Sequence, residues 1–389
     1  MVLLLVFAAT LLAAVLLSGL SERTVLSTAV LFLVVGFLAG GVTDLLTVRP
    51  EDPLTIRLAE LALFAVLFTD GMRLGVRDLT YAWRLPGRAL LLGLPLTLLL
   101  TAVLAHFVAG LPWLTSFLVG AVLSPTDPVF ASALVGREEV PLRLRRLLNV
   151  ESGVNDGLAL PIVVVLLAVA GRGEVEAATI AEELALGVII GVAVPWIALR
   201  LERRRLFDLT ESYEPLYAFS VGLLVLALGY VTHANLFLAA FSAGITVVSV
   251  SPRFRDAFHQ FGELLAELLK LAAILVFGAL VSPAFLTEIG LGGYVFALLA
   301  LILVRPAALA VSFLGARINL PEFAAAAWFG PKGFASVVYG LLVLESGVNL
   351  SGEMFHLIAL VVAASILLHS STDVAVARRF RAADLEAPS

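Results

Sequence analysis

Apolar runs about as long as one bilayer crossing follow one another along the whole chain. A helix crosses the hydrocarbon core with about 20 mostly apolar residues, and these runs are roughly 17–25 residues long. Charged residues make up 14% of the chain, compared with about a quarter of a soluble domain. The pattern predicts an all-α polytopic membrane protein whose surroundings are the lipid bilayer, and we expect no nucleic-acid partner.

We expect about thirteen transmembrane helices in a single transmembrane domain. The first apolar run has no basic segment before it, and Arg23 comes only after it, so it is interpreted as a retained helix and not as a cleaved signal peptide. The predicted spans are 1–18, 25–41, 54–72, 88–108, 112–136, 146–170, 178–200, 213–231, 234–250, 262–281, 291–314, 322–344 and 354–376.

The distribution of arginine predicts the orientation. With the N-terminus outside, nearly all loop arginines fall on the inner side, and the outer loops hold only Arg49, Arg57 and Arg172. Loops rich in Lys and Arg remain in the cytoplasm. We therefore expect a multi-pass protein of the cell membrane, with its N-terminus outside and its C-terminus in the cytoplasm.

Two similar segments, LLNVESGVN at Leu147–Asn155 and LLVLESGVN at Leu341–Asn349, lie half a chain length apart. The echo favours two inverted six-helix repeats, a common architecture of secondary transporters. Repeat 1 would cover about 1–172, a linking helix about 173–205, repeat 2 about 206–376, and a short tail 377–389. The alternative is a chance likeness between two apolar, glycine-containing segments.

Ser124-Pro125-Thr126-Asp127-Pro128 lies in the middle of the fifth predicted span. Proline lacks an N–H and clashes with the preceding turn, so the helix is expected to break here. Thr126 or Asp127 would cap the half-helix that follows, with Pro128 near its first position. A buried cap does not need a carboxylate, and a break at membrane depth must face protein or a water-filled cavity, so Asp127 indicates an ion site.

The sixth predicted span begins with Glu151-Ser152-Gly153-Val154-Asn155-Asp156. Glu151 and Asn155 are four residues apart, as are Ser152 and Asp156, so the two pairs share neighbouring parts of one helix face. Carboxylate and hydroxyl oxygens suit hard cations such as Na⁺ or Li⁺. Asp156 precedes an apolar stretch and is expected to be desolvated, so that it holds either a proton or a cation. A capping acid at a helix start would explain Glu151 alone.

A second break is predicted at Gly330-Pro331-Lys332-Gly333 in the twelfth span. Two crossed broken helices near the bilayer midplane are typical of a transporter site. The alternative is a kink that lets helices pack closely.

Three basic residues lie inside predicted spans. Arg305 needs a buried carboxylate partner, for which Glu151 is the first candidate and Glu60 the alternative. Lys332 and Lys270 are the only lysines of the chain. A buried lysine can release its proton, which indicates a functional role for Lys332. Lys270 stands at helical spacing from two glutamates and is interpreted as a structural pair or a snorkelling side chain.

These motifs resemble the monovalent cation/proton antiporter-1 family, the group of the prokaryotic NhaP proteins and the eukaryotic NHE exchangers. With the predicted spans, the resemblance covers nearly the whole chain. It rests on Thr126-Asp127-Pro128, on Glu151-Ser152 followed by Asn155-Asp156, on Arg305, and on the Gly-Pro-Lys-Gly break.

The resemblance implies an NhaA/NhaP-like fold and a homodimer, in which a core part moves like an elevator against a dimerisation part. It implies that Asp156 is alternately protonated and cation-bound, that Asn155 steadies the core, and that Arg305 pairs with Glu151. The residues that it implies around the ion are Asp156, Asp127, Thr126, Glu151 and Ser152.

The Asn155-Asp156 form is associated in this family with electroneutral one-for-one exchange. Lys332 departs from the pattern, because the family usually carries arginine there. If Lys332 releases a proton during transport, the stoichiometry differs from one to one.

We therefore expect an antiporter that exchanges Na⁺ or Li⁺ for H⁺, without a cofactor, and that serves pH homeostasis. A K⁺/H⁺ antiporter of the same fold remains an alternative, because alkali cations all prefer oxygen ligands. A cation channel would need a continuous pore but no titrating site, and an organic-anion transporter would need cationic ligands. An intramembrane aspartyl enzyme would leave Arg305 and the breaks unexplained. The zinc and serine-nucleophile signatures of hydrolases are absent from the sequence.

Overall fold

The structure is a computed structural model, and it describes residues 1–17, 27–49, 52–73, 85–127, 140–171, 177–202 and 210–386. Within these ranges every regular element is a helix, which confirms the predicted all-α class. Six helices of the described part are long and apolar enough to cross a membrane, and several shorter apolar helices accompany them. The exact number of crossings stays a prediction.

The first half of the chain forms helices up to the predicted linking helix. The elements are α1 (Val2–Leu16), α3 (Thr28–Gly36) with the π-helix η1 (Phe37–Val42), α4 (Pro53–Arg73), α6 (Leu85–Arg88) with η2 (Ala89–Gly93) and α7 (Leu94–Phe107), α8 (Trp113–Val122), α10 (Leu142–Gly171) and α11 (Ala177–Glu202).

The second half is built in the same way. Its elements are η4 (Glu211–Tyr213), α12 (Glu214–Thr232), α13 (Leu236–Val250), α14 (Arg253–Leu280), α15 (Pro283–Glu288), α16 (Leu291–Leu299) with η5 (Ala300–Val304) and α17 (Arg305–Ser312), α18 (Leu320–Trp328), α19 (Phe334–Glu345) and α20 (Ser351–Glu386). Helix α20 continues ten residues beyond the predicted end of its span at 376.

Local sequence explains where several helices begin. The side chain of Ser27 accepts a hydrogen bond from the Val30 N–H at the start of α3, and Asn235 accepts one from Leu238 at the start of α13. Asn319 accepts from Glu322 at the start of α18, where a proline occupies the first turn. These side chains satisfy N–H groups that have no partner within the helix.

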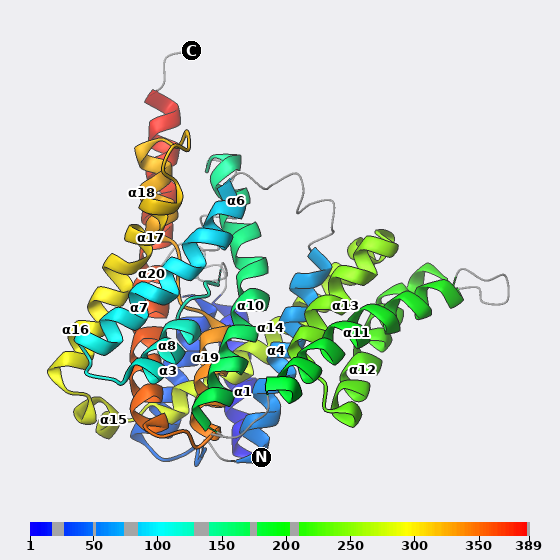
Figure 1. Ribbon diagram of the computed structural model, residues 1–389, viewed down its shortest axis with the longest axis horizontal. Helices are drawn as coiled ribbons and strands as arrows, with labels where there is room; N and C mark the ends of the chain where they lie inside the picture. The colour runs from blue at the N-terminus through cyan, green and yellow to red at the C-terminus, as the bar shows by residue number, and fades with distance from the viewer. Residues whose placement is uncertain are drawn as a thin grey trace.

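The helices form two groups with a shared middle (Figure 1). Helices α11, α12 and α13 lie on one side of the view, and α7, α16, α17, α18 and α20 lie on the other. Between them stand α4, α10 and α14; α4 packs against both α13 and α14. The N-terminus lies at one end of the molecule and the C-terminus at the opposite end.

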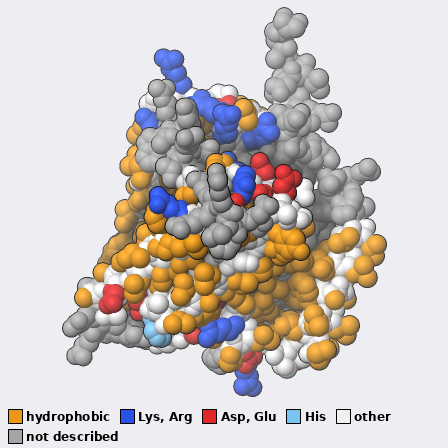
Figure 2. Space-filling view, turned by 90° about the vertical axis from the view of Figure 1, so that its right-hand side faces the viewer, with side chains coloured by type: hydrophobic (Ala, Val, Ile, Leu, Met, Phe, Trp, Pro, Cys, Tyr) orange, Lys and Arg blue, Asp and Glu red, His pale blue; other side chains and the backbone are white. Residues whose placement is uncertain are grey.

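Apolar side chains form a broad band across one face of the molecule, and charged side chains gather above and below it (Figure 2). Leu223, Leu224 and Leu264 are among the large apolar residues that remain exposed. So much exposed apolar surface is typical of a protein that contacts lipid and not water. The distribution agrees with a bilayer around the middle of the helices.

The chain leaves the helical conformation at both predicted breaks, and residues 128–136, the remainder of the predicted fifth span, lie outside the described residues. Helix α8 ends at Val122, and residues 124–127 are not helical. Helix α18 ends at Trp328, and α19 begins only at Phe334, after the non-helical segment 329–333. Pro128 lies outside the described residues.

The sequence echo adopts two different local structures. The copy Leu147–Asn155 lies wholly inside α10, whereas the copy Leu341–Asn349 covers the end of α19 and the turn after it. The two copies therefore do not occupy equivalent positions in their helices. The inverted repeat stays a prediction, supported by the two breaks and not by the echo.

Candidate functional site

The two broken helices meet at Asp127. The backbone N–H of Asp127 donates to the Pro331 carbonyl at 3.0 Å, and its carboxylate accepts from the Phe334 N–H at 3.3 Å. Asp127 therefore caps the start of α19, where the unpaired N–H groups favour a negative charge. A Cβ on Gly333 would lie 1.9 Å from the Asp127 Cβ, so only glycine allows this approach.

Helix α19 also joins the neighbouring helices by two buried hydroxyl groups. The Ser336 hydroxyl donates to the Val122 carbonyl at 2.7 Å and so satisfies the end of α8. The Tyr339 hydroxyl donates to the backbone carbonyl of Asp156 at 2.9 Å. Residues 122, 156, 336 and 339 thus tie α8, α10 and α19 together around the break.

Asn155 holds the segment that precedes Asp127. Its amide nitrogen donates to the Thr126 hydroxyl at 2.8 Å and to the Thr126 carbonyl at 3.2 Å. The Thr126 hydroxyl lies 3.4 Å from that of Ser152. The Asn155 side chain therefore fixes the broken segment of the fifth span against α10.

Arg305 and Glu151 form a bidentate ion pair. Arg305 Nη1 lies 2.6 Å from Glu151 Oε1, and Nη2 lies 2.9 Å from Oε2. Both side chains are about 95% buried, at 5% exposure each. Arg305 also donates from Nε to the Ala326 carbonyl at 3.0 Å. Arg305 therefore pairs with Glu151, the first of its two predicted partners, and not with Glu60.

The ion pair with Arg305 occupies the carboxylate of Glu151. The sequence predicted Glu151 as an ion ligand, but both of its carboxylate oxygens accept hydrogen bonds from Arg305. Gly330 makes room for the guanidinium, because a Cβ at residue 330 would lie 2.1 Å from Arg305 Cδ. The Arg305–Glu151 pair thus packs directly against the second break at Gly330.

Lys332 lies within the second break and is 4% exposed. Its backbone N–H donates to the Ser365 hydroxyl at 2.7 Å, and Ser365 in turn contacts the Nδ1 of His369 at 3.1 Å. In the part of the chain that the structure describes, the Lys332 ammonium has no hydrogen-bond partner. Lys332 therefore adds a buried, unpaired cationic group beside the Arg305–Glu151 pair.

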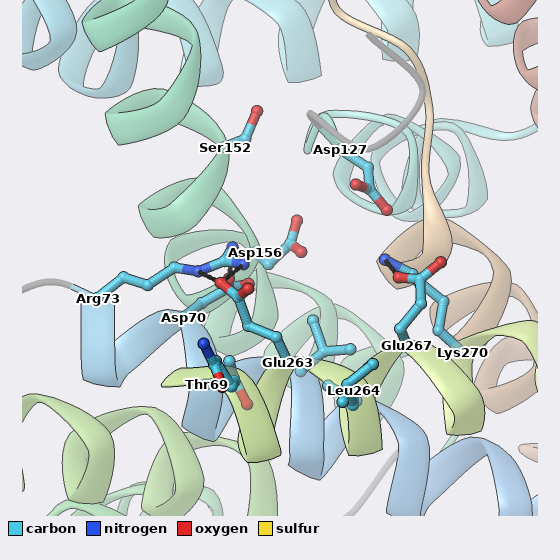
Figure 3. Close-up of a pocket in the computed structure, with 13 residues that line it drawn as sticks. Thr69, Asp70, Arg73, Asp127, Ser152, Asp156, Glu263, Leu264, Glu267 and Lys270 are labelled. Atoms are coloured by element: carbon cyan, nitrogen blue, oxygen red, sulfur yellow. Dashed lines mark hydrogen bonds and ion pairs between the residues drawn. The ribbon is translucent and has the colours of Figure 1, made fainter. Parts of the chain in front are cut away.

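A cavity of about 490 Å³ opens beside the first break. Asp127, Ser152 and Asp156 line one wall, from the broken segment and from α10. The opposite wall comes from α4 and α14 (Figure 3). Thr126 and Glu151, two further predicted ligands, are not among the lining residues.

The opposite wall carries charged residues that sequence reasoning did not select. Arg73 contacts Asp70 at 3.1 Å and Glu263 at 2.5 Å, and Lys270 contacts Glu267 at 2.8 Å (Figure 3). Asp70 was within reach of the sequence, because it is an acid inside the predicted span 54–72. Lys270 pairs with Glu267, as predicted, but it also lines the cavity.

The described residues contain no group of three or more His, Cys, Asp or Glu side chains arranged to hold a metal ion. This concerns a resident metal; a transported cation would be a substrate. The wall formed by the broken segment and α10 carries two carboxylates and a hydroxyl group, all oxygen ligands of the kind that hard cations prefer.

The sequence of this chain matches a known protein family along most of its length. The family model described as "Sodium/hydrogen exchanger, transmembrane" matches residues 7–378. The chain belongs to the sodium/hydrogen exchanger family. It is accordingly a multi-pass membrane protein.

Curated relatives in the sodium/hydrogen exchanger family carry antiporter names. The chain is 27% identical to the K(+)/H(+) antiporter NhaP2 of Shewanella sp. (strain MR-4) over 376 residues, which cover 94% of this chain and 64% of that protein. It is 25% identical to the K(+)/H(+) antiporter NhaP of Alkalimonas amylolytica, over 92% of this chain and 63% of that protein. The chain thus spans less than two thirds of these relatives.

The fold also matches a solved member with an NhaP name. The sodium proton antiporter MjNhaP1 from Methanocaldococcus jannaschii superposes with a TM-score of 0.81, at 18% sequence identity, over 97% of each chain. At this identity the likeness shows the fold alone. It confirms the predicted NhaP-like arrangement of helices.

Proposed function

We propose that this protein is a secondary antiporter in which a monovalent cation, Na⁺ or Li⁺, and a proton compete for Asp156. One observation carries the proposal: Asp156 faces the same cavity as Asp127 and Ser152, at the crossing of two broken helices. In the described part of the chain, no hydrogen bond or ion pair engages the Asp156 carboxylate, whereas Glu151 is occupied by Arg305.

The competition follows from the cost of a buried charge. An isolated carboxylate away from bulk water is expensive, so it is neutralised either by a proton or by a cation. A single carboxyl cannot hold both at once, and a site that changes sides only when neutralised exchanges one for the other. One shuttling carboxyl transfers one H⁺ for one cation, which supports electroneutral stoichiometry.

The other predicted residues position the ion site around the Asp156 carboxyl. Asp127 and Ser152 contribute oxygens from the cavity wall, while Thr126 orients Ser152 and Asn155 holds Thr126. Arg305 and Glu151 stabilise the second break with Gly330, Pro331 and Gly333. Lys332 lies beside this pair, and a proton that it released during the cycle would change the stoichiometry from one to one.

The cavity walls support an elevator movement. One wall comes from the broken segment and from α10, which hydrogen bonds tie to α8 and α19, and the other wall comes from α4 and α14. We propose that the first group slides against the second and carries the ion past it, with the protein a homodimer in the cell membrane and its C-terminus in the cytoplasm. The two inverted repeats, joined by α11, would provide the two equivalent end states.

K⁺ is the second candidate for the exchanged cation. The observation that favours it is the K(+)/H(+) name of the relatives from Shewanella and Alkalimonas. The lining oxygens do not discriminate between alkali cations by type, because selectivity depends on the exact size and rigidity of the cavity. The cation series in the experiment below decides between them.

The experiment uses everted membrane vesicles with an imposed pH gradient, to which each cation is added in turn. Na⁺ or Li⁺ is expected to collapse the gradient in the wild type and not in the Asp156→Asn variant. Asp256→Asn is the matched control, because Asp256 is exposed at the start of α14 and does not line the cavity. Normal exchange by Asp156→Asn would contradict the proposal, and cation flux without proton flux would indicate a channel.

A further inference from the structure

A second, larger cavity is lined by none of the carboxylates of the first. It encloses about 900 Å³ between α6 with η2, the start of α10, and the turn that follows α17. Arg88, Arg143 and Arg317 line it, one from each of these segments, and it shares no residue with the cavity around Asp156. The antiport mechanism gives this cavity no role.

The three arginines are held in place but not neutralised. Arg88 donates to the Leu314 carbonyl at 3.0 Å, and Arg143 donates to the carbonyl of Arg317. Among the described residues no acid lines the cavity, and none of the three arginines forms an ion pair with a carboxylate. A guanidinium has several N–H groups in a fork, so a bond to one carbonyl leaves others free. The cavity therefore concentrates positive charge that needs an anion.

The rim of this cavity is apolar and exposed. Leu91 and Leu92 line it and are 57% and 51% exposed, and Leu314 beside them is 72% exposed. Such leucines are unfavourable in water and favourable against acyl chains. The segments that carry the arginines lie toward the end of the molecule at which the chain ends (Figure 1). The arginines lie at the end of α6, at the start of α10 and in the turn after α17, on the side that the positive-inside rule places at the cytoplasmic surface.

We propose that this cavity binds the phosphate of an anionic phospholipid, with the acyl chains along Leu91 and Leu92. Arginine forks match phosphate oxygens in bidentate geometry, and basic pockets between helices at the cytoplasmic face bind such headgroups. Inorganic phosphate offers the same charge to the arginines, but it leaves the leucine rim exposed. The charge selects the headgroup, and the leucines select a lipid over a soluble anion.

The test titrates the purified full chain in neutral detergent with phosphatidylglycerol, phosphatidylcholine or inorganic phosphate. Native mass spectrometry measures the bound lipid, and the midpoint of thermal unfolding measures stabilisation. Phosphatidylglycerol is expected to bind and to raise the midpoint, and phosphatidylcholine to do neither. Equal binding of both lipids would overturn the proposal. Saturable phosphate binding that phosphatidylglycerol does not displace would also overturn it.

Arg317 is the residue to change, because its guanidinium has no hydrogen-bond partner within the described residues and its loss leaves the turn intact. Arg317→Gln is expected to weaken phosphatidylglycerol binding about fivefold, the effect of one cation near an anionic lipid. Arg317→Lys should retain most of the affinity because it keeps the charge.

The matched control is Arg200→Gln. Arg200 is also an exposed arginine, in the last turn of α11, but its guanidinium stacks over Trp196 at 4.1 Å and does not line the cavity. This variant should bind phosphatidylglycerol like the wild type. The unfolding midpoint without lipid verifies that each variant is folded. Wild-type affinity in folded Arg317→Gln and in a folded Arg88→Gln/Arg143→Gln variant would overturn the assignment.

Discussion

Gly333 and Asp127 approach so closely that the space for a methyl group at residue 333 is already filled by the Asp127 side chain. The two residues come from different broken helices, and the Asp127 carboxylate accepts the Phe334 N–H at 3.3 Å. The position of an acid in the cavity is thus set by the absence of a side chain in another segment of the chain.

Gly333→Ala is therefore expected to displace Asp127 and to reduce exchange at least tenfold. Overpacking of a tight contact costs about 1–3 kcal/mol, so the unfolding midpoint should fall as well. The measurement is cation-induced collapse of a pH gradient in proteoliposomes. Gly352→Ala is the control, because a Cβ at residue 352 meets no atom within 4 Å. Equal activity of both variants would contradict the packing argument.

The charge and the hydrogen bond of Asp127 can be separated by two substitutions. Asp127→Asn keeps an oxygen that accepts from Phe334 but removes the charge, and Asp127→Ala removes both. We expect Asn at this position to preserve folding and to raise the apparent KM for the cation about tenfold. Ala should also lower the unfolding midpoint, because the α19 cap is worth about 1 kcal/mol. Identical stabilities of the two variants would show that the cap contributes nothing.

The Arg305–Glu151 pair is expected to contribute mainly through the penalty for breaking it. Glu151→Gln leaves a buried guanidinium without its counter-charge, which costs about 3–5 kcal/mol. Replacing both partners, as in Glu151→Gln/Arg305→Met, should recover part of that loss. Thermal unfolding of the single and double variants measures the coupling between them. Strictly additive losses would show that the two residues act independently.

Competition at Asp156 predicts the form of the pH dependence. Protons occupy the carboxyl as the pH falls, so the apparent KM for the cation should rise about tenfold for each unit below the range in which the site titrates. The maximal rate at saturating cation should change much less. Initial rates over a matrix of pH and cation concentration provide the measurement. A maximal rate that falls while KM stays constant would exclude simple competition.

The sequence was sufficient to locate the breaks and the buried pair, because prolines, glycines and charged residues inside an apolar span are compatible with few local structures. Arg305 required a buried carboxylate, and Glu151 in the sixth predicted span was the first candidate. The sequence did not reveal which oxygens of that motif remain available. Glu151 was predicted as a ligand, although its two oxygens are occupied by Arg305.

The far wall of the cavity was harder to predict. Arg73 and Glu263 stand far apart in the sequence, and only the packing of α4 on α14 brings them into contact. Asp70 shares its predicted span with Arg57 and Glu60 but stands in no motif of the kind found at Asp127 or Asp156. The inverted repeat stays a prediction, and the echo does not add to it, because its two copies lie at different positions within their helices.

The link from the N–H of residue 127 to the carbonyl of residue 331 consists of main-chain atoms alone. Among the natural residues only proline at position 127 would remove one of these groups, because it lacks the N–H. Related proteins can therefore differ in the side chains around this contact, and so in the preferred ion, while the main-chain hydrogen bond between the two non-helical segments is kept. The contact that joins the two broken helices thus depends on main-chain atoms, whereas the choice of ion depends on side chains.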